Sequence, residues 1–198
     1  MADLVATDQA LTLWINQHHC PVLDAVLMPV AWFGEAGIGW ILVAALLLLF
    51  GRRRERLLTL VFLVGLAVTE YLLMPLLRDL WPRPRPYMYL EGIRQLGVRW
   101  KKFSFPSAHL HLWTQATLVY GVAYRRWLWP LVVLTLLTFY SRPYAGMHHV
   151  LDCLAGVGLG GVMGLLELAA ASRLGLLRPP ERASEPPAAA EPQPATPG

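Results

Sequence analysis

Long apolar runs, separated by short polar or basic segments, dominate the hydropathy pattern of this chain. A membrane-spanning helix needs about 20 mostly apolar residues, and the run at 57–77 fits best, with Glu70 as its single charged residue. Residues 8–33 differ, because they form an amphipathic to apolar pattern that is typical of a helix broken near Pro21. The whole pattern predicts helices at 8–33, 32–50, 57–77, 107–124, 127–140 and 150–171.

Composition indicates that these helices lie in a membrane. The chain of 198 residues is 56% hydrophobic and 15% charged, with a mean hydropathy of +0.44, whereas about a quarter of the residues in a soluble domain are charged. We therefore predict an all-α, polytopic membrane protein, with a bundle of about six transmembrane helices in one domain, 1–178. The segment 179–198, rich in proline and alanine, cannot bury a core and is predicted to be a disordered cytoplasmic tail.

The basic residues alternate with the apolar runs and form no continuous stripe, so the formal net charge of +4 does not indicate a nucleic-acid partner. Segments 52–56, 125–126 and 173–182 fall on one side of the membrane, and three polar clusters fall on the other. The two sides carry nearly equal numbers of basic residues, so the positive-inside rule alone does not set the orientation. We expect both termini in the cytoplasm, with the basic residues of the polar clusters held outside for function.

The three clusters are RDLWPRPRP at 78–86, PSAH at 106–109 and SRPYAGMHHVLD at 141–152. In the first, Arg78 ends a predicted spanning helix, and prolines then stiffen the chain and fix where Arg83 and Arg85 point. A guanidinium suits phosphate oxygens, although an arginine beside a span can also simply reach to the lipid headgroups. We favour phosphate binding for Arg78 and Arg85, and headgroup contact for Arg83.

The second cluster is placed at the start of a predicted helix. Pro106 precedes that helix, and Ser107 is a good cap or first-turn residue. The free N–H groups of Ala108 and His109 would then point at whatever binds there, and a helix N-terminus binds phosphate readily. The Ser107 hydroxyl adds a donor. An ordinary capped helix with a histidine at the interface remains the alternative.

The third cluster contains a histidine and an aspartate at helical spacing. Asp152 follows His148 by four residues, so on a helix both side chains share one face, and the carboxylate would orient the imidazole. The same row continues through Gly156, Gly160 and Gly164, which predicts close helix packing and turns the pair towards the bundle interior. His149, about 100° further round the helix, is an alternative partner of Asp152. Arg142 can fold back towards the same point.

Three other ionisable residues lie in apolar runs. Glu70 and Glu167 are intramembrane acids, and for Glu70 a structural and a catalytic role are equally open. His111 points away from His109 on the predicted helix, and we assign it no role.

In order and spacing, the three clusters resemble the signature of the type 2 phosphatidic acid phosphatase family, which reads Lys-x6-Arg-Pro, Pro-Ser-Gly-His and Ser-Arg-x5-His-x3-Asp. Here Arg78 stands at the lysine position, and Ala108 stands at the glycine. The spacing also selects His148 over His149. The resemblance covers 78–152 by motif and the membrane domain by hydropathy.

The resemblance implies a lipid phosphatase that uses no metal and no other cofactor. His148 would be the nucleophile that forms a phosphohistidine, Asp152 would orient it, and His109 would be the general acid. The phosphate would be bound by Arg78, Arg85, Ser107, Ala108 and Arg142.

A site at the membrane surface favours a lipid phosphate as substrate: undecaprenyl diphosphate, phosphatidylglycerophosphate or phosphatidic acid. The loop 79–105 adds aromatic side chains suited to the headgroup zone and basic side chains that attract anionic lipid; these are Trp81, Tyr87, Tyr89, Trp100, Phe103, Phe105, Arg94, Arg99, Lys101 and Lys102. We expect a multi-pass protein of the cell inner membrane with its site on the periplasmic or extracellular face. A lipid phosphotransferase with the same chemistry, and a lipid transporter or binding protein, are the alternatives.

Overall fold

Helices make up all the regular structure in residues 2–99 and 103–177, the part of the chain that the computed structural model describes. The elements are α1 (Ala2–Gln17), α2 (Pro21–Phe33), η1 (Glu35–Gly37), α3 (Ile38–Phe50), α4 (Arg53–Val68), η2 (Thr69–Leu73), α5 (Met74–Leu80), η3 (Pro86–Met88), α6 (Ala108–Ala123), α7 (Arg125–Tyr144) and α8 (Val150–Arg173). The expected all-α fold is confirmed. Trp100, Lys101, Lys102 and the predicted tail 179–198 lie outside the described residues.

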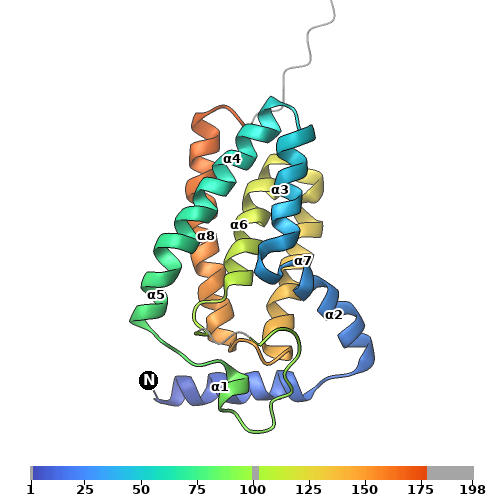
Figure 1. Cartoon of the computed structure of the whole chain (residues 1–198), viewed down its shortest axis with the longest axis vertical. Helices are drawn as coiled ribbons and strands as arrows, with labels where there is room; N and C mark the ends of the chain where they lie inside the picture. Colours follow the sequence, from blue (N-terminus) through green and yellow to red (C-terminus); the bar gives the residue numbers. More distant parts are fainter. Residues whose placement is uncertain (1, 100–102, 178–198) are drawn as a thin grey trace, which may run out of the picture.

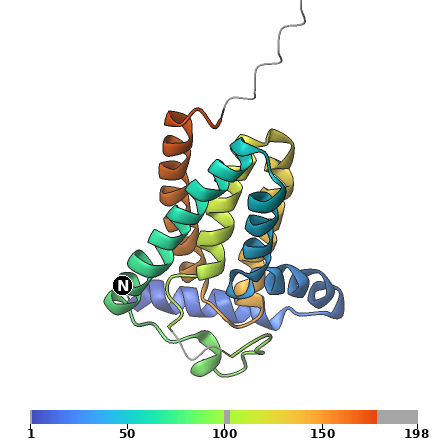
Figure 2. The same ribbon diagram turned by 45° about the horizontal axis from the view of Figure 1, so that its top comes forward.

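Helix α6 lies at the centre of a bundle, packed most extensively against α8 and α7 (Figure 1). Its Trp113 and Tyr120 meet Trp40 of α3 and Phe62 of α4 in an aromatic core. Helix α1 does not run with the bundle but lies across one end of it in both views (Figures 1 and 2). The bundle therefore presents one end that is covered by α1 and by the loops that carry the polar clusters.

The glycine row of α8 is packed against α6, as its spacing predicts. A Cβ atom on Gly160 would lie 2.4 Å from the His111 carbonyl oxygen, and one on Gly156 would lie 2.6 Å from the Ser107 carbonyl oxygen. No side chain fits at either position, so the two helices approach backbone to backbone. This contact fixes the first turn of α6 relative to the segment that leads into α8.

Several predicted helices differ from the structure at their ends. The break near Pro21 is confirmed, because α2 begins there. The predicted helix 32–50 is wrong at its start, because η1 interrupts it and Ala36 and Gly37 adopt positive φ angles of 51° and 72°. The predicted short helix 127–140 is longer, because Arg125 begins α7 rather than ending α6.

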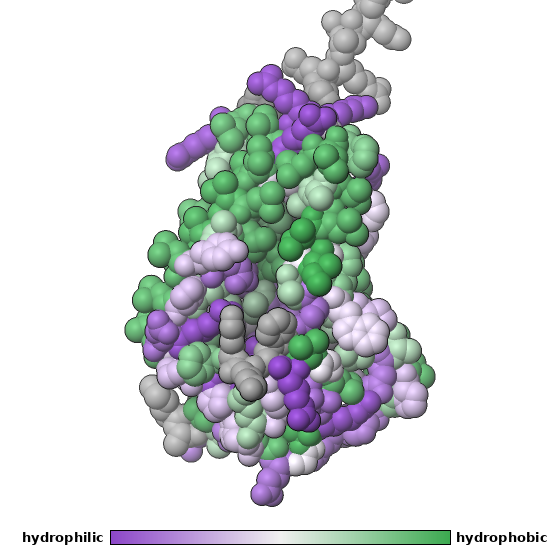
Figure 3. Space-filling model, in the orientation of Figure 1, coloured by the Kyte–Doolittle hydropathy of each residue, from purple (hydrophilic) through white to green (hydrophobic). Residues whose placement is uncertain are grey.

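Two helical stretches, Arg53–Leu80 and Val150–Arg173, are long and apolar enough to cross a membrane, and α2 with η1–α3 would make a third if this pair, bent by 46°, is one span. A bundle of six spans is therefore not confirmed. One reason is that α6 has 16 residues and is shorter than a span needs. It also carries polar residues inside the bundle, among them His111 and Gln115, which are fully buried. On the face in Figure 3, a hydrophobic band lies between two hydrophilic ends, as expected for a membrane protein.

Candidate active site

The three polar clusters meet at the end of the bundle that α1 covers. They line one cavity of about 530 Å³, whose polar wall includes Arg78, Arg85, Ala108, His109, Arg142 and His148. These residues come from α5, the loop after it, α6, the end of α7 and the segment before α8. The three clusters therefore lie together at one end of the bundle, as their predicted placement requires. Two predicted site residues, Ser107 and Asp152, are buried behind this wall and do not line the cavity.

His148 is held through both of its ring nitrogens. Nδ1 lies 2.7 Å from the Ser104 carbonyl oxygen, which can only accept, so Nδ1 carries the proton. Nε2 is then an acceptor, and Nη1 of Arg85 donates to it over 3.1 Å. Burial, followed by the nearby charges of Arg85 and Arg142, holds the pKa of His148 well below its ordinary value. The ring is therefore neutral at pH 7, with its Nε2 lone pair directed at a cation.

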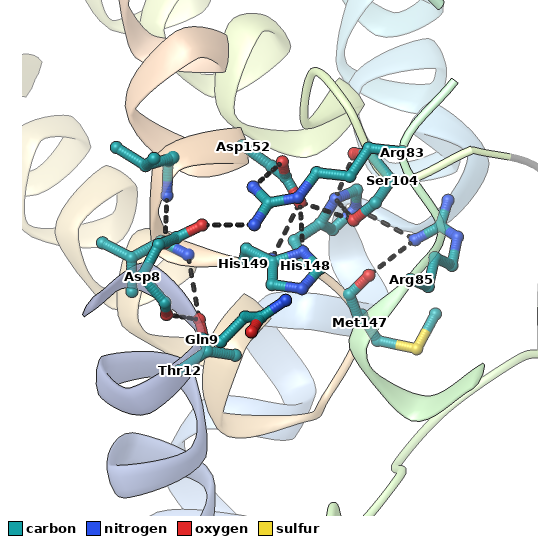
Figure 4. Close-up of polar contacts among 12 residues, drawn as sticks. Asp8, Gln9, Thr12, Arg83, Arg85, Ser104, Met147, His148, His149 and Asp152 are labelled. Carbon is teal, nitrogen blue, oxygen red and sulfur yellow. Dashed lines mark hydrogen bonds and ion pairs between the residues drawn. The ribbon is translucent and has the colours of Figure 1, made fainter. Parts of the chain in front are cut away.

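The predicted contact between His148 and Asp152 is wrong. Helix α8 begins at Val150, so His148 precedes the helix and the four-residue spacing does not place the two side chains on one face. Asp152 instead accepts from the His149 backbone N–H over 2.8 Å and from Ser104 Oγ over 2.5 Å. It caps its own helix, as a carboxylate at the third helical position does. Ser104 connects the two residues, since its hydroxyl meets Asp152 and its carbonyl meets His148 (Figure 4).

Arg83 lies in the interior, and the predicted headgroup contact is wrong. Its guanidinium is buried between Asp152, 2.9 Å away, and Asp8 of α1, 2.5 Å away (Figure 4). Burial alone would lower the pKa of Arg83, but the Asp152 and Asp8 carboxylates raise it above its ordinary value. The alternative contact of His149 with Asp152 is confirmed, with Nδ1 of His149 3.1 Å from the carboxylate. Asp152 therefore joins a charge network behind the cavity.

Helix α1 contributes polar residues that the motifs do not include. Asp8 Oδ1 accepts from the Leu151 backbone N–H over 2.9 Å, and Thr12 Oγ1 accepts from the Val150 N–H over 3.3 Å. Free N–H groups of the first turn of α8 are thus capped by another helix. The sequence held a signal for this contact, because Asp8, Thr12 and Asn16 recur every four residues and share one helix face. All three are buried.

The arginines of the cavity form a cationic cradle, which we define as Arg78, Arg85 and Arg142. The Nε atoms of Arg78 and Arg142 are buried and have no hydrogen-bond partner among the described residues, so donors remain for an anion. The first turn of α6 faces the same space with Ala108 and His109. Ser107 connects the second cluster to the third, because its backbone N–H donates to the Asp152 carbonyl oxygen over 3.0 Å.

Two carboxylates also line the cavity. Glu35 lies 3.6 Å from Nε2 of His109. Glu70 lies 2.8 Å from Nε2 of the buried His111 and pairs with this histidine. Away from the polar wall the lining becomes apolar, with Ile41, Leu63, Leu66, Ala67 and Leu112 from α3, α4 and α6. The cavity thus joins an anion site to a space suited to hydrocarbon.

Comparisons with known proteins agree with this geometry. A sequence model described as the PAP2 superfamily matches residues 58–175. An undecaprenyl-diphosphatase of Sulfolobus acidocaldarius is 28% identical over 160 residues, which is 78% of this chain and 73% of that protein. Undecaprenyl-diphosphatase BcrC of Bacillus subtilis is 29% identical over 154 residues, 75% of each chain.

Two crystal structures share the fold. LpxE of Aquifex aeolicus superimposes with a TM-score of 0.67 and 25% identity, over 81% of this chain and 93% of that one. The transmembrane PAP2 type phosphatidylglycerolphosphate phosphatase of Bacillus subtilis gives a TM-score of 0.67 and 23% identity, over 88% and 89%. At that identity the second likeness bears on the fold alone.

Proposed function

This chain belongs to the PAP2 superfamily, and from that premise we propose that it is a membrane phosphatase that hydrolyses a phosphomonoester or diphosphate of a lipid through a phosphohistidine. The observation that carries the proposal is His148, a neutral imidazole whose Nε2 faces Arg85 at the wall of a cavity that is cationic at one end and apolar at the other.

The residues divide the reaction between them. Nε2 of His148 forms a bond to phosphorus while the bond from phosphorus to the leaving oxygen breaks, and that oxygen takes the electron pair and a proton from His109. The cationic cradle and the first turn of α6 stabilise the charge on the phosphoryl oxygens. Water then attacks the phosphohistidine, His109 takes a proton from that water, and phosphate leaves as the bond to Nε2 breaks.

Asp152 acts on His148 through Ser104. Its carboxylate holds the Ser104 hydroxyl, and the Ser104 carbonyl holds the Nδ1 proton of His148. The positive charge that develops on the ring when Nε2 bonds to phosphorus is stabilised through this chain of contacts. Arg83 and Asp8 keep the carboxylate in place from the other side. The mechanism as a whole needs no metal ion.

The lipid chain would occupy the apolar part of the cavity. The relatives named undecaprenyl-diphosphatase favour a polyprenyl diphosphate as substrate. Trp81 and Tyr89 are partly exposed in the loops at the site and would sit in the headgroup zone. We place the protein in the cell inner membrane with the site on its outer face.

Phosphate release from a panel of lipid phosphates, by protein purified in detergent with EDTA, tests this function. We expect turnover of a polyprenyl diphosphate and its loss in His148→Ala, while His18→Ala, which changes an exposed histidine, keeps it. Turnover by His148→Ala would refute the nucleophile, and a requirement for added magnesium would refute the metal-free mechanism. Recovery of the phosphoryl group on a second lipid rather than as phosphate would identify a phosphotransferase.

A further inference from the structure

Glu35 lies opposite His109 in the cavity, and neither the polar clusters nor the family match includes it. The match begins at residue 58, whereas Glu35 lies in η1, between α2 and α3. Its Oε2 atom is 3.6 Å from Nε2 of His109. This is the distance of an ion pair, and hydrogen bonds at catalytic sites are often long until the substrate is bound.

The backbone around Glu35 is shaped to bring it there. A Cβ atom on Gly34 would lie 2.8 Å from Cδ2 of His109, so only glycine lets this turn approach the ring. Ala36 follows with a φ of 51°, in the left-handed region that an alanine rarely adopts. Unfavourable backbone conformations persist where the surrounding structure imposes them, and they cluster at functional sites.

The other nitrogen of His109 is held by the same bent segment. His109 makes a hydrogen bond with the backbone of Ala31 near the end of α2. Nε2 has no hydrogen-bond partner among the described residues, so the bond to Ala31 uses Nδ1. The Ala31 carbonyl fixes the ring, and Nε2 is left facing both the Glu35 carboxylate and the cavity.

The positive charges around His109 disfavour its protonation, and the Glu35 carboxylate opposes this effect. The cationic groups that face the ring are Arg142 of α7 and Arg85 of the loop, and His111 of α6 lies nearby. The other titratable groups that line the cavity are Arg78, His148, Tyr71 and Glu70, and Glu70 is paired with His111. Burial, followed by the charges of Arg142 and Arg85, holds the pKa of His109 well below its ordinary value. Protonation of this ring therefore needs a carboxylate beside it, and Glu35 lies close enough to pair with the protonated ring.

We propose that Glu35 is the positioning residue of the proton-transfer steps, holding the protonated His109 ring with its Nε2–H at the leaving oxygen. This inference rests on the proposed function. In the first step the proton on Nε2 of His109 passes to the leaving oxygen as the bond from that oxygen to phosphorus breaks. In the second step Nε2 of His109 takes a proton from the attacking water. Glu35 stabilises the imidazolium before the first transfer and after the second, and it does not itself exchange a proton with substrate.

A comparison of two substrates with different leaving groups distinguishes this role from a merely structural one. An alkyl phosphomonoester leaves as a strongly basic alkoxide and needs the proton, whereas p-nitrophenyl phosphate leaves as a weakly basic phenolate and does not. We expect Glu35→Gln to lower the first-turnover rate of alcohol release from decyl phosphate by about 100-fold, a typical contribution of general acid catalysis. The rate of nitrophenolate release should change by less than about threefold, since the acid contributes little there.

Three further variants make the test specific. In a His109→Gln background, Glu35→Gln should cause no further loss with decyl phosphate, because the two residues act as a unit. Glu35→Asp keeps the charge and should restore part of the ratio between the two substrates. Glu70→Gln removes a carboxylate from the same cavity, but one that faces His111, so it should change both rates by the same factor.

The inference would be overturned if Glu35→Gln lowered the rates of alcohol release and nitrophenolate release by the same factor. It would also be overturned if Glu70→Gln lowered alcohol release much more than nitrophenolate release. Tighter binding of inorganic phosphate by Glu35→Gln with an unchanged rate ratio would also overturn it and make Glu35 only a counter-ion of the arginines. If the wild-type protein released neither alcohol nor nitrophenolate, the proposed function itself would fail. Thermal unfolding of each variant shows whether it is folded, and Glu35→Asp carries the test if Glu35→Gln is not.

Discussion

His148 shows how neighbouring residues prepare one side chain for chemistry. The Ser104 carbonyl sets its tautomer, and burial with two arginines keeps it neutral, so Nε2 carries no proton and its lone pair accepts from Arg85. The same arginines line the cavity, where we propose that they bind the phosphoryl group. Substrate binding and activation of the nucleophile therefore depend on the same cations.

This arrangement predicts the acid side of the pH profile. Only neutral His148 attacks phosphorus, and its pKa is lowered, so the acid limb of the phosphoenzyme formation rate should lie below the ordinary histidine value of about 6.5. Arg85→Gln removes a cation that lowers this pKa, so the limb should move to higher pH. Arg99→Gln, which removes an exposed arginine bonded to Gln95, should leave the limb in place. Rapid-quench rates between pH 4 and pH 9 measure the shift; an unmoved limb in Arg85→Gln would contradict this reading.

Motif spacing identified the residues that line the cavity but not how Asp152 is connected. Those that line it are Arg78, Arg85, His109, Arg142 and His148. The contact with Asp152 failed because the sequence does not show where α8 begins: a start two residues after His148 removes the assumed helical register. Spacing along the chain also cannot reveal partners from a distant element, and so the sequence predicts a headgroup contact for Arg83 and no role for Glu35.

Among the helices, α1 holds the start of α8 through hydrogen bonds, and we call this contact the α1 clamp. The polar face of α1 is buried against the first turn of α8, while Leu4, Leu11 and Trp14 are exposed and suited to lipid. The sequence predicted a helix here and its break, but its inward polar face follows from contacts with Arg83, Val150 and Leu151.

Asp8→Asn tests this clamp. Without the carboxylate, Arg83 is left buried with one partner, so we expect a loss of about 3 kcal/mol in the free energy of unfolding together with lower turnover. Asp3→Asn is the matched control, because Asp3 is an exposed acid on the same helix and should have little effect. Denaturant unfolding in detergent measures both; equal stability of the two variants would show that the ion pair is not important.

The contact between α6 and α8 makes a second prediction at this scale. Gly160→Ala places a methyl group against the His111 carbonyl, so it should destabilise the protein by about 2 kcal/mol through overpacking. In Gly158→Ala the new Cβ meets nothing within 4 Å, and the better helix propensity of alanine should raise stability by up to about 1 kcal/mol. The same unfolding measurement compares them, and a stable Gly160→Ala variant would mean that the helices are further apart than described.

At the scale of the whole molecule, the hydrophilic end that contains the cavity adjoins a hydrophobic band, which a bilayer would surround (Figure 3). The apolar runs predicted the helices that form this band. They also predicted about six spans, which is not confirmed, because α6 is only 16 residues long and α2 is bent away from α3. Hydropathy depends only on the type of each residue, whereas the burial of a side chain depends on which other helices pack against it.

The native cysteines can establish which side of the membrane the site faces. Cys20 is exposed at the junction of α1 and α2, at the active-site end, and Cys153 is buried. We expect a membrane-impermeant thiol reagent to label intact cells through Cys20, and Cys20→Ser to abolish the labelling. Labelling that appears only after the membrane is permeabilised would reverse the orientation and put the site in the cytoplasm.

The central claim is that His148 carries the phosphoryl group, and trapping the intermediate tests it most directly. Protein mixed with a polyprenyl diphosphate labelled with ³²P in its terminal phosphate is quenched at alkaline pH, where phosphohistidine survives, and the labelled peptide is sequenced by mass spectrometry. We predict label on His148 that forms within one turnover, decays in a chase with unlabelled substrate, and is absent from His148→Ala. Label on another residue, or full turnover with no label on the protein, would contradict the account.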